Sequence, residues 1–274
     1  MLVQKEIKAV YLWTTKVRPT EPQYLCFTAE QANSTVKLNK NWSPTSIDLE
    51  TSTDWQTWSD YTIWNTITLS AVGDKVYLRN KSDTNTGFST TYQNYYYFST
   101  TWAIAASWDI NYLVNKNSTT TLVWDYFYYQ LFQNNTALTT PPELTATTLT
   151  QYCYYNMFYN CTALKEPPKL PATTLDEHCY DAMFSFCNSL NGIPLLPATN
   201  IPTGCYYEMF TRTKLKISST QDSNYTQPYR IPTTWTWTAG NYPTYRMFYW
   251  NSSAIDTPDI NTTYYVHKDN VIVG

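Results

Sequence analysis

The sequence predicts two structural parts: a β-rich N-terminal module, in the form of a small antiparallel sandwich, and then an α/β solenoid of 26-residue repeats. Two observations predict this order. Short runs with period-two alternation come first, and a recurring aromatic motif follows them. We divide the chain into an attachment segment (1–22), a β-sandwich-like module (23–120), the repeats (121–258) and a C-terminal capping strand (259–274).

The composition limits the classes of function. Of the 274 residues 14% are charged, and the formal net charge is -3. A nucleic-acid partner is not expected, because the chain has no basic stripe to neutralise phosphates. No apolar run approaches the roughly 18 residues of a membrane helix. The first residues lack the apolar stretch of a signal peptide, so we expect neither membrane insertion nor export by that route.

The N-terminal module is predicted from runs in which apolar and polar residues alternate. Such runs cover 34–38, 46–50, 66–69 and 75–79, with turn signals between them. The segment 52–58 resembles a sialidase Asp-box, but it occurs once and is one residue short. A hairpin turn is the simpler interpretation of this segment.

The second half of the chain repeats. Related motifs of the type Cys-Tyr-x-x-Met-Phe begin at positions 127, 153, 179 and 205, and a degenerate copy begins at Pro243. The links between them carry leucine and proline at fixed places, as in Leu164–Leu170. This period with leucine-spaced links is the signature of leucine-rich repeats. Apolar residues recur every four positions from Leu149 to Cys161, which predicts a helical stretch, and the prolines allow only a short strand. We therefore expect a leucine-rich-repeat-like α/β solenoid.

The repeats offer little catalytic or metal-binding chemistry. Cys153 and Cys161 are eight residues apart, too far along a helix for a disulfide within one repeat, and no Cys-x-x-Cys pair suggests zinc. Small core residues are the better interpretation of the cysteines. His178 precedes Cys179, but other repeats have Tyr152 or glycine at its position. We expect no enzyme activity, no cofactor and no metal.

Tryptophan is over-represented relative to glycine, with 11 tryptophans and 6 glycines. Glycine normally makes up about 7% of a sequence. Several tryptophans occupy turn positions that favour glycine, as in Asn41-Trp42 and Asp54-Trp55. Reading all but Trp58 as glycine would raise the glycine count from 6 to 16. We hypothesise that UGA encodes glycine in the source; the alternative is a set of true surface tryptophans used for binding. The positions concerned are Trp13, Trp42, Trp55, Trp64, Trp102, Trp108, Trp124, Trp235, Trp237 and Trp250.

The segment from Pro171 to Leu190, with its Cys-Tyr-Asp-Ala-Met-Phe motif, resembles the BspA-type leucine-rich-repeat surface proteins. The resemblance covers about residues 124–256. Residues 25–107 are similar to a β module that often precedes such repeats in gut-microbial and phage proteins, and Glu6–Pro19 resembles the opening of phage tail proteins. The family implies adhesion to a cell surface, and the phage-like opening implies a virion tail.

Comparison of the repeats separates constant core positions from variable positions. The variable positions fall away from the apolar stripe, so we expect them to face solvent and to form a carbohydrate- or protein-binding surface. The alternative is solvated filler. The hypothetical ligand-binding residues are Tyr129, Gln133, Tyr155, Tyr159, Asp181, Phe186, Tyr207 and Arg212.

These features together predict a virion structural and adhesion protein, a phage tail fibre or receptor-binding protein. Its expected partners are a host cell-surface protein or glycan, other tail proteins and further copies of itself in a homo-oligomer. The first alternative is a bacterial cell-surface BspA-like adhesin. A carbohydrate-active enzyme is the second, and no carboxylate pair supports it.

Overall fold

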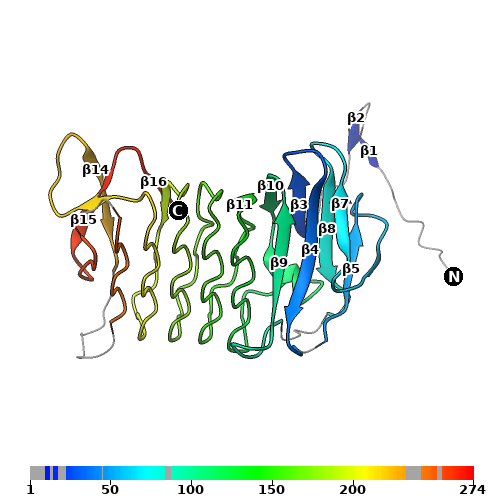
Figure 1. Cartoon of the computed structure of the whole chain (residues 1–274), viewed down its shortest axis with the longest axis horizontal. Coiled ribbons are helices and arrows are strands. Elements are labelled where there is room, and N and C mark those ends of the chain that lie inside the picture. Colours follow the sequence, from blue (N-terminus) through cyan, green and yellow to red (C-terminus); the bar gives the residue numbers. More distant parts are fainter. Residues whose placement is uncertain are drawn as a thin grey trace.

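The computed structural model describes residues 10–12, 15–17, 23–44, 46–83, 88–232, 242–251 and 255–274. A strand-rich N-terminal part leads into a row of stacked coils, and a small sheet lies at the far end (Figure 1). Most of the predicted attachment segment lies outside the described residues, as do Trp13, Trp235 and Trp237.

The N-terminal strands form three sheets. β1 (Val10–Leu12) and β2 (Thr15–Val17) make an antiparallel pair. A three-stranded antiparallel sheet has the order β7-β4-β9, with bounds Thr66–Leu69, Ser34–Asn41 and Tyr95–Thr101. A six-stranded sheet has the order β11-β10-β3-β8-β5-β6, with bounds Leu138–Thr140, Ile104–Ser107, Leu25–Ala29, Lys75–Asn80, Leu49–Ser52 and Ser59–Tyr61.

Alternation along these strands explains how the sheets pack. In β4 the side chains of Val36 and Leu38 are buried while their neighbours Thr35 and Lys37 are half-buried. Such alternation places one face of the sheet on the core. The six-stranded sheet meets this face through Phe27 of β3, whose ring centroid lies 5.0 Å from that of Phe98 in β9.

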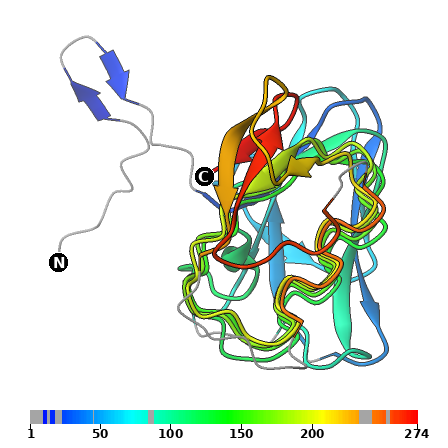
Figure 2. The same cartoon turned by 90° about the vertical axis from the view of Figure 1, so that its left-hand side faces the viewer.

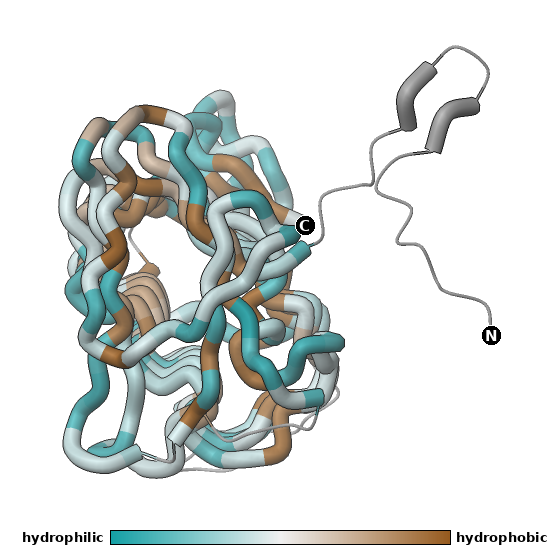
Figure 3. Tube along the Cα trace, turned by 90° about the vertical axis from the view of Figure 1, so that its right-hand side faces the viewer, coloured by the Kyte–Doolittle hydropathy of each residue, from teal (hydrophilic) through white to brown (hydrophobic). Residues whose placement is uncertain are grey.

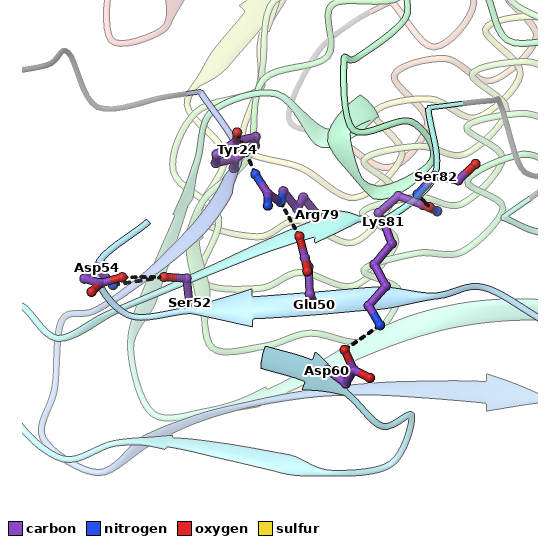
Figure 4. Close-up of polar contacts among 9 residues, drawn as sticks. Tyr24, Glu50, Ser52, Asp54, Asp60, Arg79, Lys81 and Ser82 are labelled. Carbon is purple, nitrogen blue, oxygen red and sulfur yellow. Dashed lines mark hydrogen bonds and ion pairs between the residues drawn. The ribbon is translucent and has the colours of Figure 1, made fainter. Parts of the chain in front are cut away.

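The segment that resembles an Asp-box is the loop between β5 and β6. The Asp54 carboxylate accepts hydrogen bonds from the backbone N–H groups of Gln56 (2.9 Å) and Thr57 (2.7 Å). It also accepts one from the Ser52 hydroxyl (2.9 Å) (Figure 4). These bonds lower the pKa of Asp54 to about 2. The carboxylate therefore closes a turn, as its position between two strands suggested.

Each repeat forms a coil of consecutive turns, and the coils stack with a register of 26 residues (Figure 2). Alternate backbone N–H groups donate across the stack, as from Tyr154 to the carbonyl of Cys179 (3.0 Å). The intervening N–H groups donate three residues back within the coil, as from Tyr155 to Tyr152 (3.2 Å). Together these two sets of hydrogen bonds pair the buried backbone N–H and C=O groups of the coil without a helix or a continuous strand.

The predicted fold class is therefore wrong. The described residues form several small sheets, their only helical element is the 3-10 helix η1 (Ile110–Leu113), and they contain no α/β repeat region. The spacing of four that suggested a helix comes from turns of four residues, in which every fourth residue has a positive φ. In one coil these residues are Tyr152 (56°), Asn156 (53°) and Asn160 (59°). Within the described residues of 23–120 the paired strands are all antiparallel, as predicted, and the parallel pair of β10 with β11 joins these sheets to the first coil.

Inside the stack, equivalent side chains form columns. The rings of Phe132, Phe158, Phe184, Phe210 and Phe248 stack with centroid separations of 5.4–5.6 Å. A parallel column holds Tyr128, Tyr154, Tyr180 and Tyr206. Figure 3 shows hydrophobic segments of successive coils lying one behind another. Because Phe98 stacks on Phe132 at 5.4 Å, this core continues into the N-terminal sheets.

The last part of the chain closes the far end of the stack. After the fourth coil the chain leaves the register to form β13 (Ile217–Ser218) and β14 (Tyr225–Arg230), which pair with β15 (Thr263–His267). It then returns to a fifth coil, where Tyr206 donates to Pro243 (2.8 Å). β16 (Val271–Val273) pairs in parallel with β12 (Gly192–Pro194).

Candidate binding surface

Two rows of rings run along the outside of the stack. The first row contains Tyr126, Tyr152 and His178, with centroids 4.8 and 5.0 Å apart and planes within 11° of parallel. In the second row Tyr129 stacks on Tyr155 at 5.2 Å, and at the far end Tyr207 contacts Tyr245 at 5.4 Å. These rings stack because one coil places each residue directly over its equivalent in the next.

A third and a fourth row lie one turn further along each coil. The third row contains Gln133 and Tyr159, and the fourth contains Phe186 and Arg212. The ring of Tyr159 lies 5.2 Å from that of Phe186, and the Arg212 guanidinium lies 5.0 Å from the Phe186 ring centroid. Arg212 also lies 3.8 Å from the ring centroid of Trp250, so this cation interacts with aromatic rings on two sides.

The predicted site residues thus belong to neighbouring rows, and their exposure varies. Arg212 is exposed, whereas Asp181 is only 7% exposed, so the expectation that Asp181 faces solvent is wrong. The reason is that Asp181 takes the place of a ring in the second row, between Tyr155 and Tyr207, where the flanking rings cover it. Half-buried side chains are found at Tyr129, Gln133, Tyr155, Tyr159, Phe186 and Tyr207.

His178 and Asp181 form an ion pair where the two rows meet, with 2.8 Å between His178 Nδ1 and Asp181 Oδ2. Burial raises the pKa of Asp181 to about 6, although the hydrogen bond to His178 acts in the opposite direction. The same hydrogen bond raises the pKa of His178. Gly204 makes room for the histidine, since a Cβ built there would lie 2.3 Å from the imidazole.

Sequence reasoning missed several members of this surface. Tyr126 and Tyr152 occupy the position immediately before the core cysteine, and comparison of the repeats at that position could have found them. Tyr95 comes from β9 of the N-terminal sheets, and its ring centroid lies 5.4 Å from that of Tyr129. No spacing in the sequence links Tyr95 to the repeats.

Five of the six cysteines lie in the core of the stack, and the sixth, Cys26, lies in β3 of the N-terminal sheets. All six are free and buried, and the closest pair joins two coils, with 2.9 Å between the sulfur atoms of Cys179 and Cys205. The interpretation of Cys153 and Cys161 as core residues is in accord with this burial. Within the described ranges, no cluster of three or more His, Cys, Asp or Glu side chains could hold a metal ion.

Three buried side-chain polar atoms of the described residues lack a hydrogen-bond partner, namely Asn135 Nδ2, Tyr154 OH and Asn156 Oδ1. The Asn135 side chain is 3% exposed; its carbonyl oxygen accepts a hydrogen bond from the Thr100 hydroxyl (2.6 Å), but no group of the described residues pairs with its Nδ2. An unsatisfied buried donor costs about 1–3 kcal/mol. The following coils avoid this cost with Cys161 and Cys187 at the equivalent position.

Comparison of the chain with protein-family models, with curated proteins and with solved structures gives no match. Among the described residues, no helix has the length and apolar character needed to cross a membrane.

Proposed function

We propose that this chain is a virion adhesion protein, a phage tail fibre or receptor-binding protein, that contacts the host cell surface through its four rows. The observation that carries the proposal is the alignment of half-buried aromatic side chains along one side of the stacked coils. The virion context rests on the resemblance of Glu6–Pro19 to phage tail proteins.

The rows suit recognition better than catalysis. Tyrosine supplies a large contact area at a low entropic cost, because it has few rotatable bonds. Stacking further limits the movement of Tyr129 and Tyr155, so less freedom is lost when a partner binds. The proposed contact surface involves neither a cofactor nor a metal.

Replacement of Tyr155, Tyr159 and Tyr207 together by serine tests the proposal. Binding of the purified protein to host cells should fall about tenfold or more, since aromatic anchors dominate interface energies. A matched variant with phenylalanine at the same three positions keeps the rings and should retain most of the binding. Val72→Ser, at a residue of the N-terminal part that is 67% exposed, should leave binding unchanged.

Undiminished binding by the triple serine variant would overturn the proposed surface. Peptide mass spectrometry on purified phage particles tests the virion context separately. Recovery of the chain only from the cell-envelope fraction of a bacterium would favour a bacterial adhesin instead.

A further inference from the structure

A cavity of about 350 Å³ lies where β9 meets the first coil. Its walls include Tyr95 and Tyr97 from β9 and Gln130, Gln133 and Asn135 from the coil. The volume is within the range of small-molecule sites, roughly 300–1,000 Å³. The cavity adjoins the second row, because Tyr95 is in ring contact with Tyr129.

Asn135 lines this cavity, and its Nδ2 is a buried donor without a partner among the described residues. At the equivalent position of the next two coils the thiols of Cys161 and Cys187 donate to backbone carbonyl groups at 3.0 Å. The last two coils have Thr213 and Asn251 here, and both side chains are hydrogen-bonded within the stack, so the unpaired donor at this position is confined to the coil that borders the cavity. A buried amide whose carbonyl oxygen is fixed by Thr100 and whose N–H group remains free is ready to bind a ligand acceptor.

The chemistry of the wall indicates the class of ligand. None of the described residues that line the cavity is charged; the lining consists of amides, hydroxyl groups and aromatic rings. Amide groups offer donors and acceptors together, as sugar hydroxyl groups require. The rings of Tyr95 and Tyr97 offer apolar faces for the C–H groups of a sugar ring.

We propose that this cavity binds a neutral sugar residue of a surface glycan, with Asn135 Nδ2 donating to a sugar oxygen. The proposal deepens the proposed adhesion function and rests on it for the biological source of the glycan. The second row then continues the site beyond the cavity, with Tyr129 and Tyr155 available for the next sugars of the chain.

Saturation-transfer NMR on the full chain tests the proposal, with D-galactose, D-mannose and N-acetyl-D-glucosamine as neutral probes and D-glucuronate as the charged probe. At least one neutral sugar should give protein-dependent signals, and glucuronate should give none. In Asn135→Cys, which introduces the residue of the next two coils, affinity for that sugar should fall at least tenfold. Asn188→Ala, at an exposed coil residue outside the cavity, should bind as the parent does.

Absence of binding by all three neutral sugars, or equal binding by Asn135→Cys, would overturn the sugar site. An unchanged thermal unfolding midpoint in Asn135→Cys shows that the loss is local. The sugar signals test the cavity and the binding to host cells tests the adhesion function, so either proposal can be contradicted without the other. Sugar binding by a protein that does not bind host cells contradicts only the function, whereas cell binding that is lost in the triple serine variant but without any sugar signal contradicts only the cavity.

A second inference rests on backbone geometry alone. Five tryptophans in turns of the N-terminal part have left-handed backbones. Trp64 is the third residue of a turn closed by the bond from Asn65 N to Thr62 O (3.0 Å), a position with positive φ that favours glycine. The five, with their φ values, are Trp42 (53°), Trp55 (53°), Trp64 (81°), Trp102 (58°) and Trp108 (65°).

The remaining described tryptophans differ from these five. Trp58 has no positive φ and packs against other side chains, with its ring centroid 5.1 Å from that of Tyr24 and 3.8 Å from the Arg79 guanidinium. Trp124 also has no positive φ. Trp250 occupies a coil position where Phe186 and Arg212 also have positive φ, so its conformation belongs to the coil.

We infer that the five turn residues are glycine in the protein as its source makes it, through UGA codons read as glycine, and that Trp58 is a true tryptophan. The gene and the peptide masses of the native protein test this inference. UGA at the five positions, with glycine in the peptides and tryptophan at position 58, is the expected result. UGG codons at the five positions, or tryptophan in the peptides, would overturn it.

Discussion

The N-terminal sheets and the stacked coils both contain left-handed residues, but for different reasons. In the coils every fourth residue has positive φ, whether it is Tyr152, Ala182 or Arg212, and a hydrogen-bonded coil on each side fixes its neighbours. In the N-terminal part the left-handed residues are isolated; five of them are tryptophan, and the others include Asn33 (63°), Ser118 (63°) and Gly73 (89°). A left-handed L-residue costs about 1–2 kcal/mol, and glycine and asparagine tolerate this conformation better than other residues. Stacking offsets the cost in the coils, whereas in an isolated turn tryptophan carries it without compensation.

The largest predicted change in the free energy of unfolding comes from the stacked core of the coils. Phe184 is fully buried and stacks on Phe158 and Phe210 at 5.6 Å on both sides. Phe184→Ala should lower the free energy of unfolding by about 3–5 kcal/mol, because it opens a cavity between two coils. Denaturant unfolding measures the loss. Val123→Ala, at a residue that is 51% exposed, should stay within about 0.5 kcal/mol of the parent. A loss below about 1 kcal/mol at Phe184 would contradict the stacked core.

The next prediction compares positive-φ residues in isolated turns with a positive-φ residue in a coil. Trp42→Gly and Trp55→Gly should each raise the free energy of unfolding by about 1–2 kcal/mol, because they remove the cost of positive φ at an isolated turn. Trp250→Gly should lower it, since Trp250 stacks on Tyr249 at 4.5 Å and on the Arg212 guanidinium at 3.8 Å. Thermal unfolding of the three single variants provides the measurement. If the free energy of unfolding changes in the same direction in all three variants, turn and coil positions do not differ in the cost of positive φ.

The comparison also shows what the sequence could predict. Alternation located the strands at 34–41, 66–69 and 75–80, and the spacing of the motifs gave the register in which the coils stack. The helix was wrong because turns of four residues and a helix of 3.6 residues per turn bury nearly the same stripe. Only the positive φ at every fourth residue distinguishes them, and residues such as Gln130 and Glu208 give no sign of it.

The candidate surface was predictable only in part. Positions that vary between repeats identified Tyr155 and Tyr207, because equivalent residues of a repeat share one environment. The burial of Asp181 could not be predicted, since it depends on rings in the two flanking coils. Likewise, the cavity at Asn135 depends on β9, which is distant in the sequence and meets the first coil through tertiary packing.

A smaller change in stability, one that depends on pH, is expected from the ion pair between His178 and Asp181. Burial raises the folded-state pKa of Asp181 from its ordinary value of 3.8 to about 6, so the folded protein holds a proton that the unfolded chain releases between these pH values. The raised pKa of His178 acts with the same sign: its contribution is present below its ordinary pKa of 6.5 and is lost as the pH rises through its folded value. The free energy of unfolding should therefore decrease by about 1 kcal/mol or more as the pH rises from 4 to 7.5.

Asp181→Asn removes both contributions while it keeps the size of the side chain. The decrease in unfolding free energy with rising pH should become shallower in this variant, as measured by urea unfolding at several pH values. Asn188→Ala, at an exposed coil residue, changes no titratable group and provides the control; it should leave the slope as it is in the parent. An unchanged slope in Asp181→Asn would show that the pair does not titrate as its burial implies.

The smallest predicted effect is the coupling free energy between Trp58, which has no positive φ, and a neighbouring cation. The Arg79 guanidinium lies 3.8 Å from the ring centroid of Trp58. It also donates a charged hydrogen bond of 2.6 Å to the Glu50 carboxylate (Figure 4). A cation–π contact of this kind contributes about 0.5–1 kcal/mol. A double-mutant cycle of Trp58→Leu and Arg79→Met should give a coupling free energy of that size, because the contact exists only when both side chains are present. The same cycle with Lys37 and Trp64, whose ammonium-to-ring distance is 5.4 Å, should give a smaller coupling, since the Trp64 ring stands on a strained turn and is 47% exposed. Equal couplings would mean that the Trp64 ring is held in place as firmly as the Trp58 ring, and the two residues would then differ only in backbone φ.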